Sequence, residues 1–273
     1  MPNLKAAWQK LDRAADIFWL PFIRILDETG NIFALIASAF TWLVRPPFRL
    51  SLILQSMDFI GIGSLGIVVL VASFTGAAFS LQTVYMFQMF QAEAFIGVTV
   101  AITLAKELSP VLTALMVTAR AGSAIATELG SMRITEQIDA LKTMAVSPIQ
   151  YLVAPRIVAG IIMVPLLTMV FNLIGIFGAT LVAVHVMGVD PGQYWHNIYW
   201  FIDAKDIIEG LIKAAVFGLA FSSISCYQGY YATGGAAGVG RATTRAVVWS
   251  SVMILFIDVV LTDILLIVNR PTM

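Results

Sequence analysis

The sequence predicts an all-α, polytopic membrane protein with five transmembrane helices. The first observation is composition: the chain is 59% hydrophobic and 12% charged, and its mean hydropathy is +0.90. Such a chain is too apolar for an ordinary soluble domain. The second is that several apolar runs reach the roughly 20 residues needed to cross the hydrocarbon core of a bilayer. The third is that basic residues alternate between the connections of these runs.

The five predicted spans follow the apolar runs along the chain. They lie near Phe59–Phe79, Ala94–Ala119, Ile157–Val186, Ile207–Tyr227 and Ala246–Val268. The second span is unusual because Lys106 and Glu107 lie near its centre and Pro110 follows them. Proline has no N–H group, so the regular hydrogen bonding of this helix should be interrupted there.

The distribution of lysine and arginine orients the spans. Six of these residues precede the first span, whereas the next connection, Ser80–Glu93, has none. The region around Glu128–Pro148 carries Arg120, Arg133, Lys142 and Arg156, and Met187–Gly210 carries several acids but only Lys205 as a basic residue. This alternation predicts that the N-terminus and Glu128–Pro148 lie in the cytoplasm.

The chain divides into an N-terminal part and one integral domain. Residues 1–50 are predicted as interfacial or re-entrant helices, and residues 51–273 as the five-helix transmembrane domain. Leu4–Ile25 has apolar residues at helical spacing and basic residues on other faces, which favours an amphipathic helix at the membrane surface. Packing of this helix on the protein's own core is an equal alternative. The apolar run Ile32–Val44 is too short to span a bilayer.

The segment Glu128–Pro148 is predicted as a short amphipathic helix between the second and third spans. Its apolar face would be formed by Ile134, Ile138, Leu141 and Ala145. A helix of this kind at the cytoplasmic side suits a docking element for a soluble partner. The alternative is a solvated connecting helix whose apolar stripe rests on the membrane.

Two blocks of sequence resemble a known family. The first is KELSPVLTALMVTARAGSAIATELGSMRITEQIDALKTMAVSPIQYLVAPR, Lys106–Arg156, and the second is GRATTRAVVWSSVMILFIDVVLT, Gly240–Thr262. Both are similar to the permease subunit of MlaE/YrbE-type phospholipid (MCE-type) ABC transporters. The resemblance covers the chain from roughly Phe59 to its end.

This resemblance implies a homodimer in the bacterial cell inner membrane. It also implies a cytoplasmic ABC ATPase subunit docked between spans two and three, a periplasmic MCE-domain hexamer and, in many systems, a small STAS-domain protein. The complex would move phospholipids between the inner membrane and the outer-membrane pathway and so maintain outer-membrane lipid asymmetry. The direction of transport is left open. The permease itself would be no enzyme, because ATP is hydrolysed on the partner chain.

Two groups of site residues follow from the resemblance. The ATPase-coupling residues would be Glu128, Arg133, Glu136 and Asp139. The lipid-binding residues would be Phe79, Met86, Phe87, Phe90, Lys106 and Glu107.

Each lipid-binding assignment has an alternative. An ionisable group at mid-membrane costs roughly 2.5–3.5 kcal/mol on insertion scales, so Lys106 and Glu107 should face either a lipid cavity or an internal ion-pair partner. The aromatic and methionine residues suit mobile acyl chains and equally an interfacial aromatic belt. Asp258 and Thr262 are four residues apart and are predicted to hydrogen-bond to neighbouring helices, with a proton relay as the alternative.

The residues alone are also compatible with two other classes of protein. An ion-coupled secondary transporter would use Lys106, Glu107 and Asp258, although no inverted repeat is evident. A non-transporting membrane scaffold for a periplasmic assembly is the other. No cofactor, metal or nucleic acid is expected, since His185 and His196 stand without other ligands.

Overall fold

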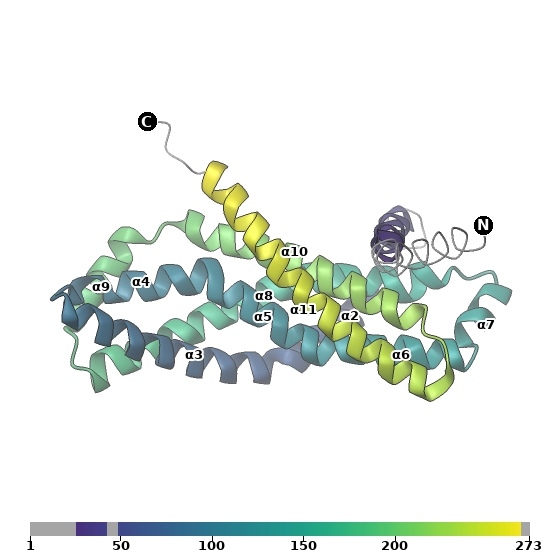
Figure 1. The fold of residues 1–273 in the computed structure, drawn as a ribbon, viewed down its shortest axis with the longest axis horizontal. Helices are drawn as coiled ribbons and strands as arrows, with labels where there is room; N and C mark the ends of the chain where they lie inside the picture. The colour runs from purple at the N-terminus through teal and green to yellow at the C-terminus, as the bar shows by residue number, and fades with distance from the viewer. Residues whose placement is uncertain (1–25, 43–48, 269–273) are drawn as a thin grey trace, which may run out of the picture.

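The computed structural model describes residues 26–42 and 49–268, and all secondary structure within these ranges is helical. The helices form an elongated bundle, with α7 (Gln137–Thr143) at one end and α9 (Pro191–Phe201) at the other (Figure 1). The all-α fold class predicted from composition is therefore confirmed.

Five helical stretches are long and apolar enough to cross a membrane, in agreement with the prediction. They cover Leu50–Met89, Glu93–Ile134, Ile149–Val186, Ala204–Tyr230 and Gly235–Val268. Each extends beyond its predicted span, because the helices continue past the apolar window at one or both ends. The first contains α2 (Leu50–Ile60) and α3 (Ile62–Met89), which meet at Gly61.

The second stretch is helical throughout but is interrupted twice by wider π-helical turns. Its segments are η1 (Glu93–Phe95), α4 (Ile96–Thr103), η2 (Leu104–Leu108), α5 (Ser109–Val117), η3 (Thr118–Gly122) and α6 (Ser123–Ile134). The turn η2 lies directly before Pro110, where the sequence predicts an interruption of the hydrogen bonding. A π turn accommodates the missing proline N–H without ending the helix.

The third stretch, η4 (Ile149–Val153), α8 (Ala154–Thr180) and η5 (Leu181–Val186), forms the centre of the bundle. It packs against α3 and against α10 (Ala204–Tyr230), and α10 in turn packs against α11 (Gly235–Val268). A Cβ atom on Gly76 of α3 would lie 2.0 Å from the carbonyl oxygen of Gly175 on α8. The two backbones therefore touch, which small residues at a helix crossing allow.

The connection Glu128–Pro148 differs from the prediction of one amphipathic helix. The helix α6 ends at Ile134, and Glu136 adopts a left-handed conformation with φ of 60°, so that α7 begins in a new direction. Ile138 is fully buried and Leu141 is partly buried, but Ala145 lies beyond the end of α7 and is exposed. The expected continuous apolar face is therefore broken by the corner at Glu136.

The opposite end contains a helix that the sequence analysis did not predict. Asp190 accepts hydrogen bonds from the backbone N–H groups of Gly192 and Gln193, and Pro191 occupies the first turn, so α9 begins with a regular cap. Tyr194 is buried and anchors this helix on the bundle.

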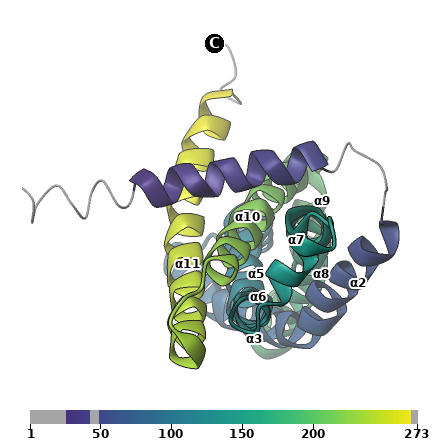
Figure 2. The ribbon, with the colours of Figure 1, turned by 90° about the vertical axis from the view of Figure 1, so that its right-hand side faces the viewer.

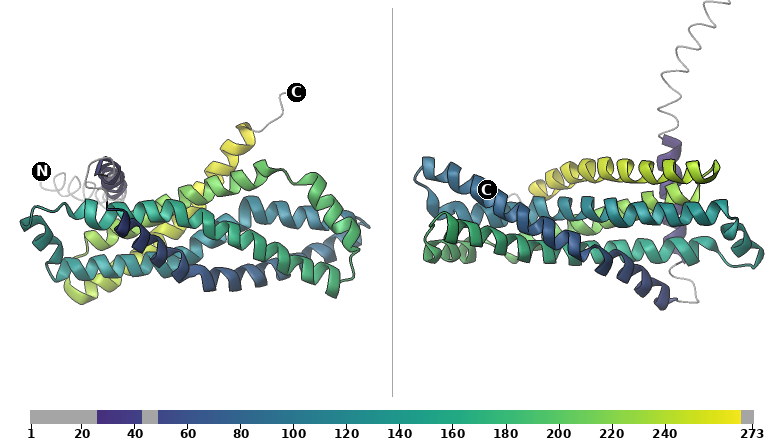
Figure 3. Two further views of the ribbon diagram at one scale, coloured as in Figure 1. Left: turned by 180° about the vertical axis from the view of Figure 1, so that it is seen from behind. Right: turned by 90° about the horizontal axis from the view of Figure 1, so that it is seen from below.

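Residues 26–42 form a helix that lies across the long axis of the bundle (Figures 2 and 3). Leu35 and Ala39 are buried, whereas Phe33 and Phe40 are exposed. The amphipathic helix predicted for Leu4–Ile25 falls outside the described residues. The membrane-surface location of the N-terminal part stays a prediction.

Candidate functional site

The most buried charge in the described residues belongs to Lys213, whose side chain is 2% exposed. Its ammonium group donates to Glu107 Oε2 at 2.6 Å, to Asp258 Oδ1 at 3.2 Å and to Thr262 Oγ1 at 2.7 Å. All three hydrogens of the ammonium group therefore have acceptors. These contacts join α10 to η2 and to α11 inside the bundle.

A second ion-pair group lies on the same side of α10. Lys106 Nζ is 2.7 Å from Asp206 Oδ1 and 3.1 Å from Glu209 Oε2. Asp206 also accepts from the backbone N–H of Asp203 in the capping box that begins α10. Together with the Lys213 group, these residues are called the charge cluster below.

The backbone geometry explains why the cluster forms here. Asp206, Glu209 and Lys213 are spaced by three and four residues and so share one face of α10. Between them, Gly210 approaches η2 so closely that a Cβ atom would lie 2.0 Å from the carbonyl oxygen of Ala105. Because of this approach, Lys106 reaches the acids Asp206 and Glu209 of α10, and Glu107 reaches Lys213 of the same helix.

The charge cluster contains more acids than bases. Four carboxylates, those of Glu107, Asp206, Glu209 and Asp258, face the two ammonium groups of Lys106 and Lys213. A small cavity of about 70 Å³ opens beside them, with Leu265 and Leu266 among its lining residues. The site thus combines negative potential with an apolar rim.

Lys106 and Glu107 each form an ion pair with α10, Lys106 with Asp206 and Glu209, and Glu107 with Lys213. Internal ion pairing is the alternative given above for these two residues, and their role in lipid binding stays a prediction. Asp258 and Thr262 hydrogen-bond to a neighbouring helix, as predicted, through Lys213. Lys213, Asp206 and Glu209 are site residues that were not predicted from sequence. The signal that could have found them is their spacing of three and four residues, which places them on one helical face of the fourth span.

The four apolar residues predicted to bind lipid lie elsewhere. Phe79, Met86 and Phe87 belong to the C-terminal half of α3, and Phe90 caps its end. Phe79 and Phe87 pack partly on the core, whereas Met86 is 52% exposed and Phe90 is 77% exposed. None of the four lines the small cavity of the charge cluster. Their role in lipid binding stays a prediction.

The predicted coupling residues fall into two places. Arg133, at the end of α6, donates to both carboxylate oxygens of Asp139 at 2.9 and 3.0 Å, and Lys142 donates to the same carboxylate at 3.0 Å. The hydrogen bonds from Lys142 and Arg133 lower the pKa of the Asp139 carboxyl. This ion pair holds the corner between α6 and α7 and leaves Glu136 exposed at its tip.

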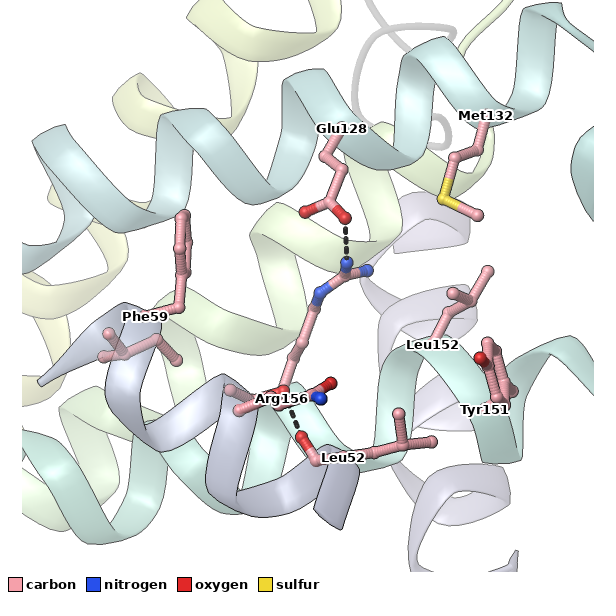
Figure 4. A pocket seen from close by; sticks show the side chains of 10 residues that line it. Leu52, Phe59, Glu128, Met132, Tyr151, Leu152 and Arg156 are labelled. Carbon is pink, nitrogen blue, oxygen red and sulfur yellow. Dashed lines mark hydrogen bonds and ion pairs between the residues drawn. The ribbon is translucent and has the colours of Figure 1, made fainter. Parts of the chain in front are cut away.

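Glu128 is one to two turns away from that corner. Its Oε1 atom accepts from Arg156 Nη2 on α8 at 2.8 Å, within a cavity between α2, α6 and α8 (Figure 4). The structure therefore separates Glu128 from Arg133, Glu136 and Asp139. Its assignment to ATPase coupling stays a prediction.

Comparison with known proteins gives consistent matches over most of the chain. Residues 53–264 match the sequence profile of the family described as Permease MlaE. A probable ABC transporter permease protein of Rickettsia bellii is 43% identical over 89% of this chain and 93% of its own length. The intermembrane phospholipid transport system permease protein MlaE of Haemophilus influenzae is 40% identical over 78% of this chain and 82% of its own length. The chloroplastic protein trigalactosyldiacylglycerol 1 of Arabidopsis thaliana is 39% identical over 77% of this chain and 60% of its own length.

Proposed function

Because the chain belongs to the MlaE permease family, we propose that it is the membrane subunit of an ABC transporter that moves phospholipids between the bacterial inner membrane and the outer-membrane pathway. This transport would maintain the lipid asymmetry of the outer membrane. The observation that carries the proposal is the charge cluster around Lys213, because ionisable residues inside a membrane-spanning bundle mark substrate paths.

The chemistry of the cluster suits a phospholipid headgroup. Its four carboxylates favour the ammonium group of an aminophospholipid, and Lys106, whose side chain is 31% exposed, is the base that a phosphate would reach. The exposed Met86 and Phe90 would then contact acyl chains, since flexible thioethers and flat rings adapt to mobile hydrocarbon. When a headgroup binds, it would replace partners in these ion pairs, and this replacement would open the lipid path between the helices. Release of the headgroup would restore the ion pairs and close the path.

The assembly proposed for this permease is a homodimer with a cytoplasmic ATPase, a periplasmic MCE-domain hexamer and a small STAS-domain protein. ATP would be hydrolysed on the partner chain. The helix α11 supports the homodimer, because only 6% of its most apolar window is buried within one chain. No residue of α11 after Ile254 is buried. Disulfide formation by a Val259→Cys variant across two copies would report this contact.

The exposed corner at Glu136 supports ATPase docking and provides the test. We expect Glu136→Lys to lower the amount of ATPase that copurifies with the permease and to lower ATP-dependent lipid transfer between proteoliposomes. The matched control is Glu93→Lys, an equally exposed glutamate at the α9 end of the bundle, which should leave both unchanged. Lipid transfer by the permease alone, driven by an ion gradient, would instead support a secondary transporter. Unchanged transfer in Glu136→Lys would contradict docking at this corner.

A further inference from the structure

A second polar cavity, separate from the charge cluster, lies between α2, α6 and the η4–α8 segment (Figure 4). Its volume is about 330 Å³, which lies within the range of small-molecule sites. Leu52, Phe59 and Met132 form apolar parts of its wall, and Ser56 lies between them on α2. It shares no lining residue with the small cavity beside Lys213.

Two opposite charges meet in this cavity. The Arg156 side chain is 12% exposed and that of Glu128 is 54% exposed, and a single ion pair of 2.8 Å joins Nη2 to Oε1. The other terminal nitrogen of Arg156, Nη1, is buried and has no hydrogen-bond acceptor among residues 26–42 and 49–268. A buried donor without an acceptor costs about 1–3 kcal/mol, and more when it is charged, so the site favours a ligand that supplies an acceptor oxygen.

We propose that this cavity binds the headgroup of a zwitterionic phospholipid. The phosphate would accept from Arg156, whose planar guanidinium matches phosphate oxygens, and the ammonium would lie against the half-exposed Glu128 carboxylate. The apolar wall around Leu52 and Met132 would contact the first carbons of the acyl chains. The inference rests on the proposed function for its ligand class, but it adds a headgroup site at the α7 end of the bundle.

The site is tested with the full-length protein in its purified complex and a photoreactive phosphatidylethanolamine. Mass spectrometry of the crosslinked protein should place the lipid on the cavity wall, at Leu52 or Met132. Ser56→Trp fills the cavity without removing either charge and should lower the crosslinking yield at these positions about tenfold or more, the factor that corresponds to roughly 1.4 kcal/mol of binding. The matched control is Leu54→Trp, which adds the same side chain at an exposed position of α2.

Variants of the two charged residues, Glu128 and Arg156, test which part of the headgroup each one binds. Glu128→Gln should weaken competition by unlabelled phosphatidylethanolamine but not by phosphatidylglycerol, which has no ammonium. Arg156→Gln should weaken both, and its folding is checked by thermal unfolding of the same sample. Equal crosslinking in Ser56→Trp and Leu54→Trp, or equal effects of Glu128→Gln on both lipids, would overturn the proposal. Displacement by millimolar inorganic phosphate alone would also overturn it, in favour of a free-anion site.

These outcomes are distinct from a failure of the proposed function. A complex that binds lipid in this cavity but transfers none would contradict the transport proposal and leave the headgroup site intact. A complex that transfers lipid while Ser56→Trp retains full crosslinking would contradict the site alone.

Discussion

Lys213 shows how much one side chain contributes to this bundle. It lies in the fourth span, yet its partners Glu107, Asp258 and Thr262 come from the second and fifth spans. The carboxylates would be strongly unfavourable inside an apolar bundle without a cation. One lysine therefore links three helices through polar contacts in the candidate lipid path.

Replacing this lysine should destabilise the protein. We expect Lys213→Met to lower the free energy of unfolding by about 1–3 kcal/mol, because the partly buried carboxylates of Glu107 and Asp258 then lose their cation. Thermal unfolding in nanodiscs measures the effect. The control is Lys205→Met in the first turn of the same helix, which is exposed. The double variant Lys213→Met with Asp258→Asn should be less destabilised than the sum of the two single variants; strict additivity would show that the pair does not interact.

Asp139 gives a prediction about pH. Its hydrogen bonds from Lys142 and Arg133 lower its pKa in the folded protein below the ordinary value of 3.8. The ionised carboxylate stabilises the α6–α7 corner at pH values above the pKa that Asp139 has in the unfolded chain. This stabilisation is lost as the pH falls through the lower pKa of Asp139 in the folded protein. A fluorophore on Thr143→Cys, in a Cys226→Ser background, should therefore report an unchanged corner from pH 7 to pH 5 and a change only below about pH 4. The Asp139→Asn variant should show no such acid transition, and a transition near neutral pH would contradict the assignment.

Helix crossings in this protein depend on backbone contact between small residues. The approach of α10 to η2 at Gly210 brings two acids and a lysine of α10 within reach of Lys106 and Glu107. The π turn at η2 adds to this arrangement, because it changes the direction of consecutive side chains just before Pro110. The charged site between these helices therefore depends on the close contact at Gly210 and on the π turn before Pro110, as well as on the charged side chains.

A single methyl group should test this crossing. We expect Gly210→Ala to destabilise the protein by about 1–3 kcal/mol, the usual cost of overpacking, because its Cβ atom would lie 2.0 Å from the Ala105 oxygen. Gly66→Ala on α3 is the control, since no atom lies within 4 Å of the added Cβ atom. That substitution should be neutral or slightly stabilising, as expected for alanine in a helix. Equal unfolding temperatures for the two variants would refute the close contact.

The bundle has two chemically different ends. The corner of α6 and α7, with the ion pairs of Arg133 and Lys142 to Asp139, lies at one end, and the aromatic helix α9 with its acidic flanks lies at the other (Figure 1). The headgroup cavity at Arg156 lies toward the first end, whereas Met86 and Phe90 lie toward the second. A lipid moving along the bundle would therefore meet polar side chains toward the first end and exposed apolar side chains toward the second.

The orientation of these ends is open to a direct measurement. Lys142→Cys on α7 and Gln193→Cys on α9 both place a thiol at an exposed position, and the native Cys226 is buried. A membrane-impermeant maleimide added to intact spheroplasts should label Gln193→Cys at once and Lys142→Cys only after lysis, since basic connections stay in the cytoplasm. Labelling of both from one side would contradict the single span, Ile149–Val186, between the two sites, and the reverse result would contradict docking of a cytoplasmic ATPase at Glu136.

The number and approximate position of the five spans follow from sequence alone, because hydropathy is a local property that an 18-residue window already contains. The interruption before Pro110 follows for the same reason, since a missing N–H acts within one turn. The corner at Glu136 did not follow from sequence, because the spacing of Ile134, Ile138 and Leu141 fits one helix. The left-handed backbone of Glu136 divides that helix in two, and the ion pair of Arg133 with Asp139 joins the two parts.

Which charges pair was decided by the three-dimensional packing. Lys213 and Glu107 are 106 positions apart in the chain, and only the contact of α10 with η2 brings them to 2.6 Å. From the sequence alone, charged residues within a membrane span are expected to have a partner. That partner could be either a lipid headgroup or another side chain of the protein. Close packing at Gly210 brings these side chains together in this chain, because helices that touch at the backbone leave their neighbouring side chains within hydrogen-bonding distance.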